Sequence, residues 1–517
     1  MTQSLIKKVV VVGGGTAGWM TAALLSKALA GNVAVELIES EEIGTVGVGE
    51  ATIPMIKLFN KYLEIDAADF IAKTNGSLKL GIEFVNWGRQ GDRYLHTFGA
   101  IGRAHDLIDF HHYWLRARDI GMDVSLWDYS LHYRAAMANK FDQVEGEAGG
   151  TGMPYAFHFD AGLYARYLRN YAEARGVKRT EGKIVDVIQN NETGYIEAVK
   201  LESGALAEGD FFVDCSGFRG LLIEQTLKTG YHDWSHLLRC DRAFAVPCES
   251  VKPLTPYTRS TARKAGWQWR IPLQSRIGNG LVYSSQYLSD DEAATTLMSN
   301  LDGKALADPR QIKFLTGKRK KTWNKNVLAL GLASGFMEPL ESTSIHLVQS
   351  GLSRFIQMFP TAGFNETEID QYNQDTMDEW LLIRDFLVLH YHLNQRTDSP
   401  FWRDVREMKV PESLTQKMAL FAGTARICHD KRDLFSDPSW LQVMIGQNLQ
   451  PTGYHPMAAN MSNQQLREYL SEIKGTIMQA ASRMPSHEKF IADNCAAEGL
   501  DRPTATAAAQ RVAALVG

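Results

Sequence analysis

Two groups of residues in this 517-residue chain have types and spacings that could carry chemistry. The first is G-G-G-T-A-G at 13–18, in which Gly13 makes a tight turn, Gly15 admits a pyrophosphate to the backbone, and Gly18 lets a helix approach a strand. Glu39 follows about 20 to 25 residues later, where a carboxylate accepts hydrogen bonds from ribose hydroxyls. These residues predict a dinucleotide site, and a glycine-rich turn without a ligand is the alternative.

The second group is W-Q-W-R-I-P at 267–272. Successive side chains of a strand point to opposite faces, so Trp267 and Trp269 are expected to share one face. Two indoles on one face could line the site of a flat aromatic ligand. An aromatic core face that ends at Pro272 is the structural alternative.

The hydrophobic pattern predicts the elements that position the glycine motif. Residues 8–12 form a buried strand, the glycines open a helix, and residues 33–38 form a second strand that ends in Glu39. This βαβ unit points helix N–H groups at the expected pyrophosphate. FAD is favoured over NAD because the chain has no second G-x-G-x-x-G, and strands at 211–214 and 327–330 are expected to line the other half of a flavin cleft.

Helical patterns are expected in the remainder of the chain. They are clearest at 103–120, 160–175 and 344–360, and helix predominates after about residue 365. The strands are spread over the first two thirds of the chain, which favours an α/β core with a helical cap.

The composition excludes several classes of protein. Lys plus Arg total 55 against 59 for Asp plus Glu, a net charge of -4, so no basic field attracts nucleic acid. The five cysteines are scattered without a C-x-x-C, which favours a reducing, cytoplasmic compartment. No run reaches about 18 apolar residues, so we expect a soluble protein with no membrane partner. His111-His112 and His390-Tyr391-His392 match no ligand motif and are interpreted as structural histidines without a metal.

Several motifs in chain order carry a resemblance to a known family. They are G-G-G-T-A-G-W at 13–19, G-V-G-E-A-T-I-P at 47–54, G-S-L-K at 76–79, W-Q-W-R-I-P at 267–272 and E-P-L-E-S-T-S-I at 338–345. Together they resemble the flavin-dependent halogenases of the tryptophan halogenase family, over residues 8–350.

The resemblance implies a fold. We expect a mixed α/β architecture with a Rossmann-like, FAD-binding core of the GR2 flavin monooxygenase type and a mostly helical substrate-binding cap. The core is expected at 1–365, with a helical insertion at about 100–155 that packs toward the cap. The cap is expected at 366–517, in one compact unit with the core.

The resemblance also implies a reaction. In that family a separate reductase supplies FADH2, O2 gives a flavin hydroperoxide, and chloride or bromide attacks it to form hypohalous acid. The acid travels to a lysine, which Lys79 resembles, and Glu341 resembles its acidic partner. A free lysine has a pKa of about 10.4, so a haloamine route needs burial to lower that pKa, whereas an ammonium would hydrogen-bond the reagent.

The substrate and the rivals of this reaction follow from the same residues. A small, indole-like aromatic is expected as the substrate, and a homodimer is left open. A two-component flavin hydroxylase or epoxidase on the same scaffold is the first rival. A non-catalytic FAD-binding or sensor protein is the second.

Further site residues are carried over from the resemblance. Residues 342–345 are expected to open a helix whose N–H groups bind an anion, with the halide at Thr343 and Ser344. His96 and Phe98 are expected to sandwich the substrate, with Trp440 opposite. The tryptophan motif, expected to discourage monooxygenation, comprises Trp267, Trp269, Ile271 and Pro272. The expected cofactor residues are Gly13, Gly15, Thr16, Ala17, Gly18, Glu39, Gly49, Ala51, Val185, Leu332 and Ile345.

Two features depart from the family pattern. Members that bind free tryptophan hold its amino acid end with adjacent tyrosines, and the segment around Trp440 and Tyr454 has no tyrosine pair. This argues against free tryptophan and leaves open a smaller indole, another electron-rich aromatic or a larger indole-bearing molecule. Ser344 stands where many members carry glycine, which leaves the choice between chloride and bromide open.

Overall fold

The computed structural model describes residues 6–29, 31–41, 49–144, 152–361, 363–428 and 430–498. Gly47 and Val48 of the predicted loop motif lie outside these ranges, as do residues 145–151 of the predicted insertion and the end of the predicted cap after residue 498.

A six-stranded sheet carries the N-terminal βαβ unit. The valines of β1 (Lys8–Val12) are buried because this strand pairs in parallel with β2 (Ala34–Glu39) on one side and β12 (Phe211–Asp214) on the other. Helix α1 (Thr16–Ala28) begins directly after the glycine turn. The predicted βαβ unit and both later strands are therefore confirmed. The strand order is β20-β21-β12-β1-β2-β8, with β8 at Lys178–Glu181, β20 at Trp323–Asn324 and β21 at Val327–Ala329.

A seven-stranded sheet holds the tryptophan motif. All residues of β16 (Gly266–Pro272) are buried, since this strand lies between its antiparallel neighbours β15 (Thr258–Arg263) and β17 (Arg276–Tyr283). The order is β18-β14-β17-β16-β15-β5-β6, with β5 at Gly81–Val85, β6 at Arg93–Thr97, β14 at Arg242–Glu249 and β18 at Arg310–Lys313.

A small sheet brings two of the predicted motifs together. Its order is β3-β7-β4, in which β7 (Ala156–Asp160) pairs with β3 (Gly49–Ala51) and with β4 (Ser77–Lys79). Ala51 lies opposite His158, and Lys79 lies opposite Ala156. The loop motif and the predicted catalytic lysine thus flank the same strand. Two further sheets comprise β9 (Ile184–Gln189), β10 (Ile196–Leu201) and β11 (Leu206–Glu208), and β13 (Tyr231–Asp233), β19 (Gly317–Arg319) and β22 (Gly335–Phe336).

Helices lie at all three predicted places, although the one expected at 103–120 begins only at Phe110, and the named elements after residue 366 are helical in the described part of the chain. The helices of the first part are α2 (Ile56–Tyr62), α3 (Ala67–Lys73), α4 (Phe110–Asp119), α5 (Leu131–Met137), α6 (Ala161–Glu173), α7 (Asp290–Met298) and α8 (Ser344–Gln357). Those that follow are α9 (Glu366–His392), α10 (Pro400–Glu407), α11 (Glu412–Thr424), α12 (Asp437–Gly446), α13 (Asn463–Arg483) and α14 (His487–Asn494). Short helical turns are η1 (Leu126–Tyr129), η2 (Gly217–Arg219), η3 (Leu221–Thr226), η4 (Gly331–Ala333), η5 (Pro339–Glu341) and η6 (Pro456–Asn460).

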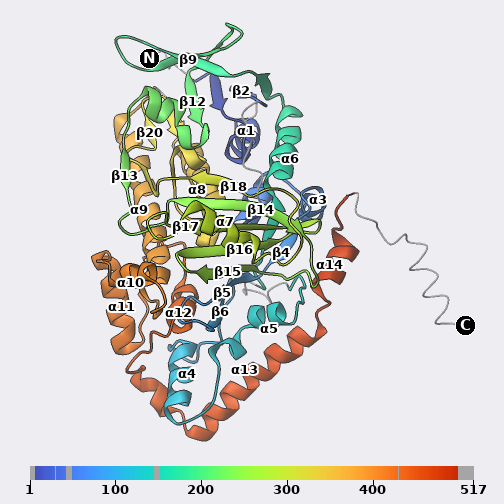
Figure 1. Ribbon diagram of the computed structural model, residues 1–517, viewed down its shortest axis with the longest axis vertical. Helices are drawn as coiled ribbons and strands as arrows, with labels where there is room; N and C mark the ends of the chain where they lie inside the picture. The colour runs from blue at the N-terminus through green and yellow to red at the C-terminus, as the bar shows by residue number, and fades with distance from the viewer. Residues whose placement is uncertain are drawn as a thin grey trace, which may run out of the picture.

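Figure 1 shows α1 and β2 near one end of the molecule, the seven-stranded sheet across the middle, and α4 and α13 at the other end. One hydrophobic cluster joins this sheet to the C-terminal helices, and it includes Trp267 of β16, Phe386 of α9 and Trp440 of α12. None of the helices in the described ranges is long and apolar enough to cross a membrane.

Candidate active site

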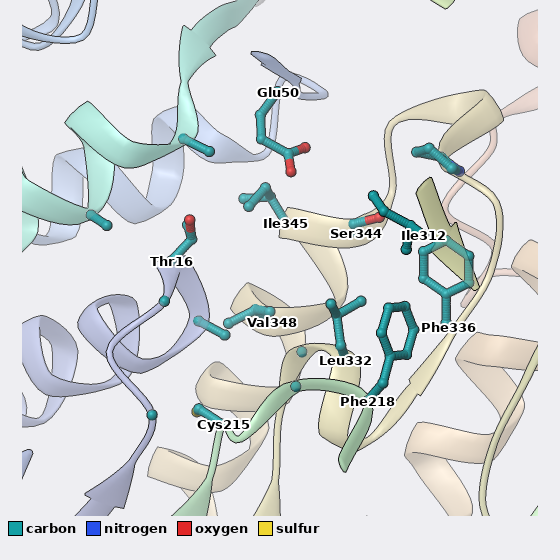
Figure 2. Close-up of a pocket in the computed structure, with 18 of the residues that line it drawn as sticks. Thr16, Glu50, Cys215, Phe218, Ile312, Leu332, Phe336, Ser344, Ile345 and Val348 are labelled. Atoms are coloured by element: carbon teal, nitrogen blue, oxygen red, sulfur yellow. The ribbon is translucent and has the colours of Figure 1, made fainter. Parts of the chain in front are cut away.

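A cavity of about 760 Å³, here called the central cavity, lies between the two large sheets. Figure 2 shows Thr16, at the start of α1, and Phe336 on opposite sides of it, with Leu332 and Ile345 between them. The wall therefore combines the start of a helix with a broad apolar surface.

The glycine turn forms one end of the central cavity. Gly13 has a φ of 111°, and a Cβ built on it would lie 2.4 Å from the Cys215 carbonyl oxygen. A Cβ on Gly18 would lie 1.8 Å from the Gly13 carbonyl oxygen, so only glycine lets α1 approach β1 this closely. A Cβ on Gly15 would meet nothing within 4 Å. Gly13 and Gly18 thus make the expected turn and close approach, and Gly15 leaves the backbone open to the cavity.

Glu39 stands at the end of β2 beside this turn. Its Oε1 accepts a 2.5 Å hydrogen bond from Arg179 Nε, and its Oε2 accepts a 3.3 Å hydrogen bond from Trp19 Nε1. Arg166 and Arg169, which the sequence patterns did not single out, also line the cavity. These groups fit an FAD molecule. The bare turn and the guanidinium groups suit its pyrophosphate, the carboxylate suits its ribose, and the apolar wall suits its flat ring.

The tryptophan motif forms another wall of the central cavity. Trp267 and Trp269 both line it, with ring centroids 6.1 Å apart, and Ile271 follows on the same face. Pro272 does not line it, and its carbonyl oxygen instead accepts a 2.6 Å hydrogen bond from the Ser77 hydroxyl. The shared face of the two indoles, predicted from strand alternation, is present.

The remaining predicted cofactor residues fall on the central cavity with one exception. Val185 is 54% exposed and does not line it, whereas its neighbour Ile184 does. Adjacent side chains of β9 face opposite ways, so the Val185 side chain points away from the cavity. Those that line the cavity are Thr16, Ala17, Gly49, Ala51, Leu332 and Ile345.

Lys79 lies at the end of β4 with a fully buried side chain. Its Nζ donates to the Thr52 carbonyl oxygen at 3.0 Å and to Ser342 Oγ at 2.7 Å, and it lies 5.3 Å from the Phe98 ring centroid. Burial lowers the pKa of Lys79 to about 7, and the attraction of Glu341 opposes that shift only in part. The amine and the ammonium are therefore both accessible near neutral pH.

Glu341 ends the η5 turn and is buried between two histidines. His96 Nδ1 lies 2.9 Å from its Oε2, and His390 Nε2 lies 2.8 Å from its Oε1. Burial alone would raise the pKa of Glu341, but the charge and hydrogen bonds of the two imidazoles outweigh it and lower the pKa to about 2. Glu341 is thus a carboxylate at neutral pH.

Three residues of this site were not assigned from the sequence. Ser342, with a φ of 59°, lines the central cavity and also touches Lys79, so it stands between the cavity and the lysine. Its place beside Glu341 in the motif was a usable signal. His390 is a buried histidine, as interpreted, but it contacts Glu341. Glu50 also lines the cavity (Figure 2), and burial raises its pKa to about 7.

The predicted halide residues mark the start of α8. The helix begins at Ser344, as expected, but Thr343 at the N-cap makes no side-chain capping bond, because its backbone is already helical at φ -92° and ψ -9°. Ser344 lines the central cavity, whereas Thr343 is buried behind the wall.

The predicted substrate residues occupy different places. His96 is engaged by Glu341, and the half-buried Phe98 ring lies beside Lys79. Trp440 is 1% exposed and packs edge-on against Phe386 at 4.9 Å. The Phe386 ring also lies 5.7 Å from the His96 ring. Phe386 therefore stands between Trp440 and the pair of His96 and Glu341.

Comparison with known proteins assigns the family. A model of the tryptophan halogenase family matches residues 8–463. The chain belongs to this family. It is 32% identical over 523 residues to tryptophan 7-halogenase RebH of Lentzea aerocolonigenes, covering 94% of this chain and 98% of that protein.

Solved structures of flavin-dependent halogenases resemble the chain over nearly its whole length. The structure of Xcc4156 from Xanthomonas campestris matches with a TM-score of 0.93 and 46% identity, over 96% of this chain and 100% of the other. That of BrvH from Brevundimonas sp. BAL3 matches with a TM-score of 0.91 and 43% identity, over 95% and 99%.

The halogenase is therefore a flavin-dependent enzyme with a mixed α/β fold and a Rossmann-like core. Enzymes of this kind generally rely on a separate flavin reductase. The predicted family, fold class and reaction class are confirmed.

Proposed function

We propose that the enzyme halogenates an indole-like, electron-rich ring with chloride or bromide, that Lys79 presents the oxidised halogen, and that Glu341 accepts the ring proton. The observation that carries this proposal is the buried Lys79, which reaches Ser342 on the wall of the central cavity. The Ser342 hydroxyl thus lies between the central cavity, which suits flavin, and the Lys79 amine, which suits the oxidant.

The central cavity would hold FAD. The N–H groups of the glycine turn would hold its pyrophosphate, and Glu39 and Arg169, which line the same end of the cavity, would bind its polar groups. When bound, reduced flavin from a separate reductase supplies the electrons with which O2 oxidises the halide to hypohalous acid. Ser344, at the start of α8, would offer its backbone N–H to the halide.

Lys79 suits either form of the final reagent. As an ammonium it would hydrogen-bond the oxygen of hypohalous acid and polarise the halogen. As a free amine it would form a haloamine, and its lowered pKa makes that form available. Thr52 and Ser342 hold the Nζ in one place in both cases.

Lys79 and Glu341 can supply and accept the protons of the electrophilic substitution at the ring. A ring carbon bonds to the halogen while the halogen–oxygen bond breaks, and the oxygen leaves as water after it takes a proton from the Lys79 ammonium. The Glu341 carboxylate accepts the proton that the ring carbon loses. Transfer of that proton from Glu341 to the Lys79 amine, directly or through water, restores both residues, so an aromatic C–H bond and hypohalous acid become a C–halogen bond and water.

A direct test uses indole as the probe. Purified enzyme, FAD, a flavin reductase, NADH and bromide are expected to give bromoindole by mass spectrometry. Lys79→Ala and Glu341→Gln should lower that yield by at least about a hundredfold while FAD affinity stays within about threefold.

The alternatives predict other outcomes. Hydroxyindole that forms without halide would favour a hydroxylase or epoxidase. Unchanged behaviour of both variants would remove Lys79 and Glu341 from the mechanism. Bromide anomalous scattering away from Ser344 and Thr343 would overturn the halide position.

A further inference from the structure

Glu338 is a buried acid that the proposed reaction does not use. It lies between β22 and η5, with a side chain that is 0% exposed. No lysine, arginine or histidine of the described residues forms an ion pair with it, and burial raises its pKa to about 7. A buried carboxyl group without a cation is costly, so its contacts indicate what it does.

The Cys240 thiol also interacts with this carboxyl group, and the hydrogen bonds from Trp267 and Tyr391 reach the same oxygen. Oε2 accepts a 2.8 Å bond from Trp267 Nε1 and a 2.5 Å bond from the Tyr391 hydroxyl, whereas the buried Oε1 has no partner among the described residues. Trp267 belongs to β16 and Tyr391 to α9. One carboxyl oxygen therefore joins the sheet to the helix.

This contact fixes which edge of the Trp267 indole meets the central cavity. Glu338 does not line the cavity, so the N–H that it holds points behind the wall. An indole has only this one donor, so Trp267 presents a surface without a hydrogen-bond donor. Trp269, on the same wall, has no hydrogen-bond partner for its N–H among the described residues. The two indoles of the motif thus differ in what they offer a ligand.

The same contact continues to the reaction site. Tyr391 is the neighbour of His390, which contacts Glu341, and Glu341 lies three residues after Glu338. The two acids of the E-P-L-E segment are therefore both held by one turn of α9. A shift of Glu338 would move the cavity wall and the surroundings of Glu341 together.

We propose that Glu338 is a positioning residue: it holds the Trp267 indole with its N–H turned away from the central cavity, and so keeps that part of the wall free of hydrogen-bond donors. An oxidant that must leave the cavity before it reacts meets no donor at Trp267. This inference rests on the proposed function only for the passage of the oxidant. The contact between Glu338 and Trp267 shapes the wall of the central cavity whatever reaction takes place there.

The test compares Glu338→Leu, which removes the acceptor, with Glu338→Gln, which retains one. The readouts are bromoindole and hydrogen peroxide formed per FADH2, and the absorption spectrum of bound FAD. Glu338→Leu should lower the ratio of bromoindole to peroxide about tenfold and shift the FAD spectrum, and Glu338→Gln should stay within about threefold of the parent.

Trp267→Phe is the matched control, in which the effect of Glu338→Leu is measured again without the indole N–H. If Glu338 acts through the indole N–H, adding Glu338→Leu to Trp267→Phe should change the ratio by less than about twofold further. Should Glu338→Leu alone fail to fold, Trp267→Phe together with Tyr391→Phe should restore folding, because the two changes remove both buried donors left unpaired.

Three results would overturn the proposal. They are an unchanged product ratio and FAD spectrum in folded Glu338→Leu, full additivity of Glu338→Leu and Trp267→Phe, and failure of Trp267→Phe with Tyr391→Phe to rescue a misfolded Glu338→Leu. Failure of the proposed function is recognised separately, since the parent enzyme would then give no bromoindole while the FAD spectrum still reports on Glu338.

Discussion

At the scale of single residues, Lys79 and Glu341 are both buried, but their surroundings give them very different pKa values. Burial moves the pKa of Lys79 down to about 7, whereas two imidazoles outweigh the effect of burial on Glu341 and lower its pKa to about 2. Near neutral pH Lys79 exchanges a proton readily, whereas Glu341 rests as a carboxylate that is free to accept one. Such a separation is how two neighbouring residues take different roles in acid–base chemistry.

The lowered pKa of Lys79 predicts a pH dependence of stability. An unfolded lysine titrates near pKa 10.4, so between about pH 7 and 10 the unfolded chain binds the proton that folded Lys79 does not. Stability must therefore rise with pH in this window. From pH 7 to 9 the contribution of Lys79 amounts to about 2 kcal/mol.

Lys79→Met should remove this contribution. The free energy of unfolding, measured with urea at pH 7, 8 and 9, should rise about 2 kcal/mol less in the variant than in the parent. The control is Lys61→Met at an exposed position of α2, which should keep the slope of the parent. Equal slopes for the parent and Lys79→Met would show that the lysine titrates normally.

At the scale of elements, the glycine turn predicts that two neighbouring substitutions act differently. Gly18→Ala places a Cβ 1.8 Å from a backbone oxygen and should destabilise the fold by about 1–3 kcal/mol. Gly15→Ala meets no protein atom within 4 Å and has an extended φ of -74°, so the fold should keep its stability.

Gly15→Ala should instead weaken FAD binding. Its Cβ would stand where the pyrophosphate approaches the backbone, so the Kd for FAD should rise at least about tenfold, or about 1.4 kcal/mol. Thermal unfolding and FAD titration on both variants separate the two effects. If Gly15→Ala bound FAD as tightly as the parent, the pyrophosphate would lie elsewhere.

The strands and helices also show which features of the fold can be predicted from local sequence patterns. The βαβ unit and the shared face of Trp267 and Trp269 follow from alternation and spacing alone, and both are present. Alternation alone does not say which face of a strand meets a ligand: in β9, Ile184 lines the central cavity, whereas the side chain of Val185, which was carried over from the resemblance, is exposed. Helix α8 begins within 342–345 as expected, but the sequence pattern does not show that the backbone of Thr343 is already helical, with no capping bond from its side chain.

At the scale of the whole molecule, the site is assembled from segments that no local pattern links. Thr52, Lys79 and Ser342 meet within hydrogen-bond distance, although 263 residues separate the last two. His390 looked like any structural histidine because its contact with Glu341 depends on how α9 packs. The resemblance located Lys79 and Glu341, but the residues that hold them required the tertiary structure.

The most distant of these contacts involves α14. His487 Nε2 accepts a 3.1 Å hydrogen bond from the Leu78 N–H, and its Nδ1 lies 2.8 Å from the Leu254 carbonyl oxygen. Burial lowers the pKa of His487 to about 4, so the ring is neutral at neutral pH and one nitrogen can accept while the other donates. Strand β4 is an edge strand, and His487 therefore holds the residue before Lys79 from its free side.

His487→Phe should thus reduce halogenation without weakening FAD binding. The Leu78 N–H would lose its partner, which costs about 1–3 kcal/mol of stability, and Lys79 would no longer be held at one distance from Ser342. We expect kcat for bromoindole to fall about tenfold, with the Kd for FAD within about threefold, because His487 does not line the central cavity. His236→Phe, at an exposed position, is the control and should change neither. A lower melting temperature with an unchanged kcat would mean that α14 stabilises the fold but does not position the lysine.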